Sequence, residues 1–248
     1  MTLSGRRIVV TRAEEQSGSL LSGLRRRGAT PVLVPSIRFV PPDDAAPLAD
    51  AARTIDEADW VVFTSATGVA YGWGAIGEAW PSGLPAGVRV AAVGSGTADA
   101  LRAAGAPVDF VPREAIGDVL IEELPVEAGA RVVLLRSHIG REAIATGLAN
   151  RGADVRDVTA YRTLTEADPE AAAAALDPLP DAVTFTSPST VRGFLAALAN
   201  PSALQDVPLV AIGPVTAAAL DPSGLRAAAV ADPHTVAGLL DALDRLFA

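Results

Sequence analysis

Short apolar runs rich in valine and isoleucine alternate along the chain with longer segments rich in alanine and leucine. Unbroken apolar runs are typical of strands buried on both faces, and their alternation with helical segments indicates parallel sheets covered by helices. Ten strands are predicted, over Arg7–Thr11, Thr30–Val34, Trp60–Thr64, Val88–Val93, Val108–Val111, Arg131–Leu135, Asp154–Val158, Ala182–Thr186, Leu209–Ile212 and Ala227–Ala231. The predicted helices include Ser17–Arg27, Gly68–Glu78, Gly96–Ala104, Gly117–Leu124, Arg141–Arg151, Thr190–Ala199, Val215–Leu220 and Thr235–Leu246.

Several sequence motifs occur twice and in the same order. The pairs are Arg7–Arg12 with Arg131–Arg136, Arg27–Ala29 with Arg151–Ala153, Val62–Ser65 with Thr184–Ser187, and Val90–Thr97 with Leu209–Thr216. The copies lie about 120 residues apart, which is near the usual size of a domain and longer than a solenoid repeat. The repeat therefore predicts two similar lobes of five strands each, with a cleft between them across which paired motifs face each other.

Two stretches interrupt the rhythm, Ser36–Pro42 and Thr159–Thr165, and each follows the second strand of a repeat. Both are expected to be extended, and the proline pair favours that geometry in the first. If they connect the lobes, residues 1–36 and 166–248 form lobe one, residues 42–158 form lobe two, and 37–41 and 159–165 are the linkers. A single cut at Leu124-Pro125 is the simpler alternative, and the sequence pattern does not separate the two.

Composition narrows the function classes. Half of the 248 residues are hydrophobic, but no apolar run reaches the ~18–20 residues that span a membrane, and no signal-peptide-like stretch is found. We therefore expect a cytoplasmic protein. The net charge of −9 opposes nucleic-acid binding. All 20 basic residues are arginine and cysteine is absent, which excludes Schiff-base chemistry on lysine and thiolate catalysis.

Polar residues follow the predicted strands, where ligands of open parallel sheets bind. The candidate substrate-binding residues at these positions are Thr11, Arg12, Ser65, Gly94, Ser95, Thr97, Arg136, Ser187, Gly213 and Thr216. Several of them also begin helices, whose free amide groups and positive dipole ends bind anions. Together they would suit a large ligand with many carboxylates or phosphates. The alternatives are ordinary helix caps for serine and threonine, and tight turns for glycine.

Groups for acid–base or metal chemistry are scarce. The two histidines, His138 and His234, fall in different lobes, and the sequence lacks a paired-histidine metal motif and a nucleophile elbow. Tyr161 falls in the second connection, where it is expected at the mouth of the cleft. A phenol there can donate a proton or a hydrogen bond, although a packed hinge aromatic is the alternative.

The chain resembles a known family through an ordered set of motifs. They are Val10-Thr11-Arg12, Gly28-Ala29 followed by Pro35, Phe63-Thr64-Ser65, Val93-Gly94-Ser95-Gly96-Thr97-Ala98, Phe110-Val111-Pro112, Gly152-Ala153 leading to Tyr161-Arg162-Thr163, Phe185-Thr186-Ser187-Pro188-Ser189-Thr190-Val191 and Ile212-Gly213-Pro214-Val215-Thr216. Over essentially its whole length, the chain is similar to the uroporphyrinogen-III synthase family.

The resemblance implies an α/β fold of two flavodoxin-like lobes, each a five-stranded parallel sheet flanked by helices, joined by a two-stranded linker. One lobe would contain both chain ends, which favours the partition with two linkers over a cut at Pro125. The implied substrate is hydroxymethylbilane, with eight carboxylates. The implied enzyme needs no metal or cofactor, is a monomer, and binds neither nucleic acid nor membrane. A transient contact with hydroxymethylbilane synthase is a further expectation.

The implied reaction is a dehydration followed by rearrangement. The terminal hydroxyl leaves as water, ring D attacks through its substituted carbon to form a spiro intermediate, and reclosure inverts that ring. Tyr161 is implied as the group that assists departure of the hydroxyl, while Ser65, Thr97, Ser187 and Thr216 would bind carboxylates. The alternatives are a noncatalytic tetrapyrrole sensor, a periplasmic-type binding protein and a nucleotide-binding enzyme. The last is disfavoured because the chain lacks a phosphate-loop lysine.

Overall fold

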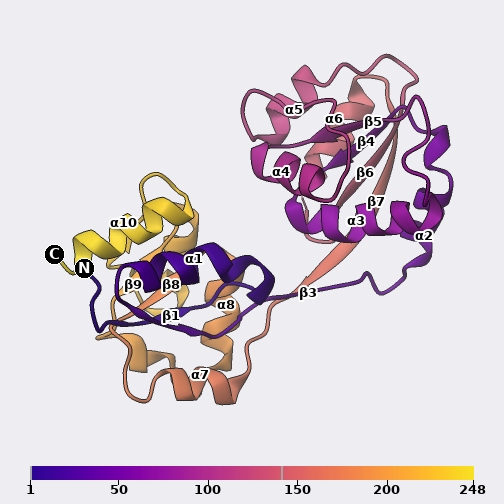
Figure 1. The fold of residues 1–248 in the computed structure, drawn as a ribbon. Helices are drawn as coiled ribbons and strands as arrows, with labels where there is room; N and C mark the ends of the chain where they lie inside the picture. Colours follow the sequence, from indigo (N-terminus) through magenta and orange to yellow (C-terminus); the bar gives the residue numbers. More distant parts are fainter. Residues whose placement is uncertain (1, 141) are drawn as a thin grey trace. The chain divides into compact units, whose positions relative to one another are not determined.

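The computed structural model describes residues 2–140 and 142–248 and divides the chain into two compact units. Unit 1 comprises the chain up to Arg38 and from Leu164 onward, and unit 2 comprises Phe39–Thr163. Each unit is a five-stranded sheet with helices on both faces (Figure 1). The chain is therefore an α/β protein in which a continuous middle segment forms one unit and both chain ends contribute to the other.

Unit 1 contains a sheet with the strand order β10-β9-β8-β1-β2, in which every pair is parallel. Its strands are β1 (Arg7–Val10), β2 (Thr30–Leu33), β8 (Ala182–Phe185), β9 (Leu209–Ala211) and β10 (Ala229–Val230). Its helices are α1 (Glu14–Arg26), α7 (Pro169–Ala175), α8 (Pro188–Ala197), α9 (Pro214–Ala218) and α10 (Val236–Leu246), with 3₁₀ turns at Pro201–Leu204 and Asp221–Ser223.

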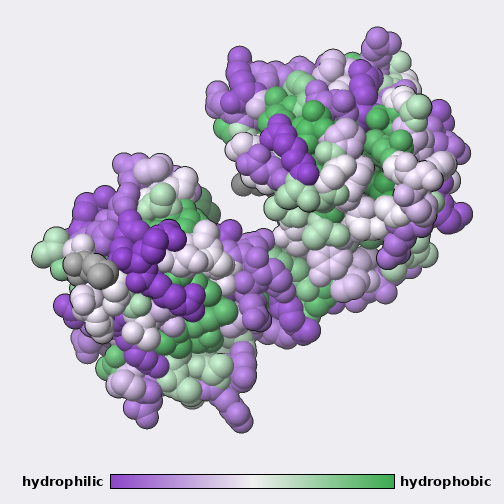
Figure 2. Space-filling view, viewed as in Figure 1, coloured by the Kyte–Doolittle hydropathy of each residue, from purple (hydrophilic) through white to green (hydrophobic). Residues whose placement is uncertain are grey.

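Side-chain alternation gives this sheet two apolar faces. Ile8 and Val10 of β1 pack into the core beneath α1 and α10, whereas Val9 packs into the core beneath α7 and α8 (Figure 1). Figure 2 shows the outer side of α1 as a hydrophilic band, as expected for a helix that buries only Ser17, Leu20, Gly23 and Leu24. A strand buried on both faces favours apolar residues at nearly every position, which is why the apolar runs are almost unbroken.

Unit 2 contains a sheet with the strand order β3-β7-β6-β4-β5. Its strands are β3 (Arg38–Val40), β4 (Trp60–Phe63), β5 (Arg89–Ala92), β6 (Arg131–Ser137) and β7 (Asp154–Leu164). Its helices are α2 (Ala46–Arg53), α3 (Ala66–Ala79), α4 (Ser95–Ala103), α5 (Gly117–Glu123) and α6 (Ala143–Asn150), with a 3₁₀ turn at Ile55–Glu57. Val61 and Phe63 pack into the core beneath α2 and α3, and Trp60 and Val62 into the core beneath α5 and α6.

The two units share structural details at the repeated motifs. In unit 2, the Asp59 carboxylate accepts a hydrogen bond of 2.8 Å from the backbone N–H of Arg131. In unit 1, the Asp181 carboxylate accepts an equivalent bond of 2.8 Å from the N–H of Arg7. In both copies, an aspartate just before one strand accepts a hydrogen bond from the first residue of the neighbouring strand. The internal repeat therefore includes this hydrogen bond as well as the sequence motifs.

Three predictions from the sequence need correction. The strand predicted at Val108–Val111 is wrong, because this segment makes only an isolated bridge from Phe110 to Ala91, and β3 supplies the fifth strand at the opposite edge. The strand predicted to end at Val158 continues to Leu164 as β7, so most of the second connection is strand. The helix predicted from Arg141 begins at Ala143, and Arg141 itself lies outside the described residues. Helices α2 and α7 were not predicted.

The segment between β2 and β3 packs tightly against α8. The Ser36 side chain is fully buried, and its carbonyl oxygen lies 2.0 Å from the position that a Cβ atom would occupy at Gly193. No L side chain can occupy this position without moving the Ser36 backbone. Gly74 of α3 is a helical glycine where an added Cβ atom would meet no other atom within 4 Å, so it is a matched control.

We expect Gly193→Ala to lower the free energy of unfolding by about 2–3 kcal/mol, because the added methyl group displaces a buried backbone. Gly74→Ala should raise it by about 0.5–1 kcal/mol, because alanine loses less conformational freedom than glycine in a helix. Urea denaturation followed by circular dichroism measures both, with each unit fitted separately. Equal effects of the two substitutions would contradict the proposed close contact.

Candidate active site

The carboxyl ends of β4 and β6 form the point in unit 2 where strand connections lead in opposite directions. From β4 the chain crosses to β5 through α3, whereas from β6 it crosses to β7 through α6. Ligands of open parallel sheets bind at such a point. A pocket of about 320 Å³ lies here, large enough for part of a small-molecule ligand. Its walls include Thr64, Ser65, Gly117, Arg136, Ser137 and Tyr161.

A shift in strand register places Tyr161 at this pocket. β6 and β7 pair residue by residue as far as Thr159, after which Tyr161 takes the next place in the register and Ala160 is an extra residue. In an unbroken strand, Tyr161 would lie on the opposite face from Val158 and Ala160. The bulge cancels this alternation, and all three side chains join the same core. Tyr161 is only 7% exposed, so its ring is part of the core of unit 2.

Two aromatic rings hold the Tyr161 ring. Tyr71 of α3 stacks against it with ring centroids 5.8 Å apart and an interplanar angle of 17°. Phe39 of β3 meets it edge to face at 5.6 Å and 84°. The carbonyl oxygen of Tyr161 also accepts a hydrogen bond of 3.1 Å from the N–H of His138. Ring and backbone are thus both constrained, which fixes the position of the phenol oxygen.

The phenol oxygen of Tyr161 lies 3.0 Å from the Ser65 hydroxyl oxygen. Ser65 is the N-cap of α3, where its hydroxyl accepts a hydrogen bond of 3.0 Å from the N–H of Gly68. A Cβ atom at Gly68 would lie 3.2 Å from the Ser65 hydroxyl and 3.8 Å from Tyr161 Cε1. Glycine at this position therefore leaves more room beside the Ser65 hydroxyl, whereas an added Cβ atom would be in ordinary van der Waals contact with the Tyr161 ring.

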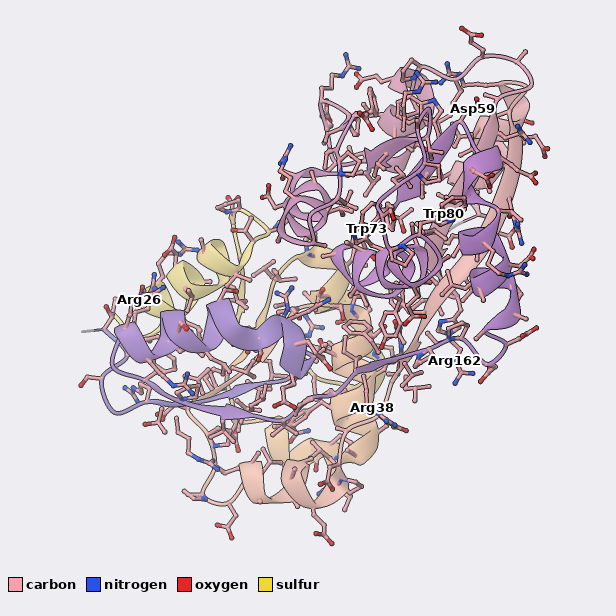
Figure 3. The ribbon with its side chains drawn as sticks, turned by 45° about the vertical axis from the view of Figure 1, so that its right-hand side comes forward. Arg26, Arg38, Asp59, Trp73, Trp80 and Arg162 are labelled. Carbon is pink, nitrogen blue, oxygen red and sulfur yellow. The ribbon has the colours of Figure 1, made fainter. Side chains whose placement is uncertain are left out.

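α3 is anchored by Trp73 within the helix and by its C-cap residue, Trp80, which are labelled in Figure 3. The Trp73 indole N–H donates to the carbonyl of Ala104 at 3.2 Å, and that of Trp80 to the carbonyl of Ala52 at 2.9 Å. The helix that follows Ser65 is therefore fixed against neighbouring segments at two further points.

In the same view, Asp59 and Arg162 mark opposite ends of the unit 2 sheet, and Arg162 follows Tyr161 directly.

Arg136 forms one wall of the pocket but is already engaged. Its Nε and Nη2 atoms donate to the two carboxylate oxygens of Asp157, both at 2.7 Å. Its Nη1 atom donates to the carbonyls of Ser137 at 3.1 Å and Gly140 at 2.8 Å. The hydrogen bonds to Asp157 raise the pKa of the Arg136 guanidinium. The Arg136 side chain therefore holds the loop after β6 in place, and most of its hydrogen-bond donors are already used within the protein.

The equivalent strand ends in unit 1 carry Thr11, Arg12 and Ser187. Thr11 is fully buried and donates to the carbonyl of Thr184 at 2.7 Å. Ser187 caps α8 and forms a capping box with Thr190. Arg12 has a different environment, because its Nε atom is buried without a hydrogen-bond partner among the described residues. Partial burial lowers the pKa of Arg12. Of the three, Arg12 is the group best placed to gain from an added carboxylate.

The glycine motifs begin α4 and α9 in their respective units. Gly94 and Gly213 have φ values of −169° and −172°, so the backbone there is extended and does not require glycine. A Cβ atom at Gly94 would lie 2.6 Å from Ala115 Cβ, which identifies close packing and not a strained turn as the reason for glycine. Thr97 and Thr216 are buried in the first turns of these helices, and Ser95 is exposed.

Sequence reasoning missed Phe39, Gly68 and Asp157 as parts of this site. Phe39 and Gly68 act through packing, which no motif records, and Asp157 was one of many scattered acidic residues. Neither histidine lines this pocket. The Nδ1 atom of His138 accepts a hydrogen bond of 3.3 Å from the N–H of Thr163, so this residue supports the strand end next to Tyr161.

The residues at 2–140 and 142–248 include no group of three or more histidine, aspartate or glutamate side chains placed to hold a metal ion. Among the helices of these same residues, none is both long and apolar enough to cross a membrane.

Comparisons with known proteins agree on one family. A family model described as uroporphyrinogen-III synthase HemD matches residues 18–241. The uroporphyrinogen-III synthase of Synechococcus elongatus is 31% identical to this chain over 253 residues, covering 98% of this chain and 96% of that protein. The match thus extends over nearly the whole of both proteins.

Two solved structures have a similar fold. A mutant uroporphyrinogen III synthase from Thermus thermophilus superposes with a TM-score of 0.61 at 24% identity, covering 97% of this chain and 98% of that one. The uroporphyrinogen-III synthetase of Helicobacter pylori gives a TM-score of 0.65 at 18% identity, covering 97% and 99%. These structures share the α/β fold with two mainly parallel sheets flanked by helices.

We expect Asp157→Asn to lower the free energy of unfolding by about 1–2 kcal/mol, because the amide cannot accept both hydrogen bonds from the partly buried guanidinium. The Arg136 and Asp157 side chains are only 12% and 27% exposed. The control is Asp99→Asn, which breaks the exposed pair of Asp99 and Arg102 and should cost less than about 0.5 kcal/mol. Urea denaturation of unit 2 compares them, and equal costs would show that Arg136 is not held by Asp157.

Proposed function

Because the chain belongs to the uroporphyrinogen-III synthase family, we propose that it cyclises hydroxymethylbilane to uroporphyrinogen III, with loss of water and inversion of ring D. The observation that best supports a catalytic role is the phenol of Tyr161, which lies at a pocket beyond the strand ends and 3.0 Å from Ser65. It is the group in this pocket best suited to donate a proton to a leaving hydroxyl.

The first step is departure of the terminal hydroxyl of the substrate. Tyr161 donates its proton to this oxygen as the carbon–oxygen bond breaks, so that water leaves and the phenolate remains. The lone pair of the pyrrole nitrogen supplies the electrons, giving an azafulvene cation. Since the substrate provides most of this driving force, a single positioned acid is enough on the protein side.

Ring closure needs positioning more than further acid catalysis. Ring D attacks the cation through its substituted carbon, and the spiro intermediate fragments and recloses at the free carbon. The proton lost from that carbon as ring D regains its aromatic form restores the Tyr161 phenol, so protons balance over the cycle. The protein holds the two ends together and suppresses closure without inversion, which is catalysis by proximity and orientation.

In the same proposal, the two units are flavodoxin-like lobes, with residues 37–41 and 159–165 as linkers. The order β2-β1-β8-β9-β10 in unit 1, which is 2-1-3-4-5 along its sequence, supports this comparison. Ser95 and Ser187 at helix starts, with Arg12, would bind substrate carboxylates. A monomer is sufficient for this arrangement, and product transfer from hydroxymethylbilane synthase would be transient.

The direct test is an assay with freshly generated hydroxymethylbilane that separates the type III from the type I isomer after oxidation. The expected product is predominantly type III, formed faster than in a control without protein. Type I product at the spontaneous rate from a folded protein would contradict the proposal and favour a noncatalytic tetrapyrrole-binding role.

We expect Tyr161→Phe to lower kcat by about 10²-fold or more, because the phenol proton is lost while the ring remains in place. The free energy of unfolding should fall by only about 0.5–1.5 kcal/mol, the typical contribution of one hydrogen bond. Steady-state formation of the type III isomer and urea denaturation measure the two effects. Full activity in this variant would remove Tyr161 from the mechanism.

A further inference from the structure

The two copies of the repeat differ at the N-cap of the helix that follows the central strand. In unit 1, Thr190 closes a capping box, and its hydroxyl accepts hydrogen bonds of 3.2 Å from the N–H groups of Thr186 and Ser187. Counted from the shared cap serines, the corresponding residue in unit 2 is Gly68, which has no side chain. The N-cap of α3 therefore lacks the side-chain partner that Thr190 gives the N-cap of α8, and in this sense it is an open cap.

The neighbouring positions differ in the same way. Counted from the shared caps, Tyr71 in unit 2 corresponds to Gly193 in unit 1. Counted from the shared Arg-Gly-Ala motifs, Tyr161 corresponds to Ile37. Unit 1 thus has a glycine against the backbone of Ser36, where unit 2 has a stacked pair of tyrosines. The open cap in unit 2 is occupied by a phenol that the other copy lacks.

We propose that Ser65 is a positioning residue that acts through Tyr161, and that it does not bind a substrate carboxylate. Either hydroxyl of this pair can donate to the other. The Ser65 oxygen already accepts the N–H of Gly68 at the positive end of the α3 dipole, which leaves its own proton free to point at the phenol oxygen. Ser65 then donates to the Tyr161 oxygen, and the phenol proton is directed into the pocket. This inference rests on the proposed function and specifies how its acid is oriented.

The same hydrogen bond would also stabilise Tyr161 after it has donated its proton. The phenolate formed at Tyr161 would keep the hydrogen bond from Ser65, whose hydroxyl needs no reorientation when the negative charge appears. A donor fixed in advance by a helix start stabilises developing charge without a cost of reorganisation. The bond between Ser65 and Tyr161 therefore links the cap of α3 to turnover, as well as to stability.

The test compares Ser65→Ala with Thr235→Ala. Thr235 caps α10 in unit 1 by accepting a hydrogen bond of 3.1 Å from Gly238, so both variants lose a helix cap and their unfolding midpoints should fall by a similar few degrees. Only Ser65→Ala should lower kcat, by about 10-fold or more, with KM nearly unchanged. Ser65→Thr keeps the hydroxyl and should restore most of kcat. A raised KM with normal kcat would instead identify Ser65 as a carboxylate-binding residue.

A double variant tests whether Ser65 acts through Tyr161. In the Tyr161→Phe background, Ser65→Ala should lower kcat by no more than about 2-fold, because the group that it orients is already missing. Independent multiplication of the two losses would overturn the proposal. Equal losses of kcat in Ser65→Ala and Thr235→Ala would also overturn it, since the effect would then be one of helix stability.

A spectroscopic measurement separates this inference from the proposed function. The chain has two tyrosines, so ¹³Cζ-labelled tyrosine gives two resonances, and Tyr161→Phe identifies the one that belongs to Tyr161. Ser65→Ala should move the Tyr161 resonance, whereas Thr235→Ala should leave it in place. An unmoved resonance would overturn the inference whatever the activity. Absence of type III product from the wild-type protein would overturn the proposed function but not this bond.

Discussion

The register shift between β6 and β7 is the constraint on which the candidate site depends. One extra residue, Ala160, turns the next side chain from the α6 side of the sheet to the α3 side. Without it, the Tyr161 ring would lie on the face away from Ser65 and Tyr71. With it, the phenol reaches the open cap of α3 at the pocket beyond the strand ends. Bulges of this kind often re-aim side chains next to active sites.

The two copies of the repeat place the same helix cap in different surroundings. Both units begin a helix with a capping serine after a central strand, and in unit 1 the surrounding polar groups satisfy one another within the capping box. In unit 2 the change to Gly68 removes that internal partner and admits an aromatic side chain instead. The capping serine is thus kept in both copies, while the cap serine of unit 2 is also hydrogen-bonded to a tyrosine.

Much of the fold could be predicted from the sequence, because strands buried on both faces appear as short runs of apolar residues. Nine of the ten predicted strands have a counterpart, and the error at Val108–Val111 arose because a short apolar run by itself does not ensure pairing along its length. Tyr161 could be singled out by its chemistry and by resemblance. Its burial could not be predicted, since a bulge is a property of pairing between β6 and β7 and leaves no pattern in either strand alone.

The candidate binding residues illustrate a second limit. Arg136 has the charge expected of a carboxylate-binding residue, but four of its five N–H donors are occupied by Asp157 and two carbonyls. Arg12 has the same residue type and an equivalent place in the repeat, and it has an unsatisfied buried Nε atom. Residue type and position are visible in the sequence, whereas the competition for hydrogen-bond donors depends on residues brought together only by folding.

The most direct test of the account is whether a tetrapyrrole binds at the Tyr161 pocket. Uroporphyrinogen III, kept reduced, would be titrated into protein labelled with ¹³Cζ-tyrosine, with calorimetry confirming that binding occurs. The account predicts a saturable change in the Tyr161 resonance at the concentration where binding saturates, and a smaller change for Tyr71. Saturated binding that leaves the Tyr161 resonance unchanged would contradict it, because the product would then occupy another part of the protein.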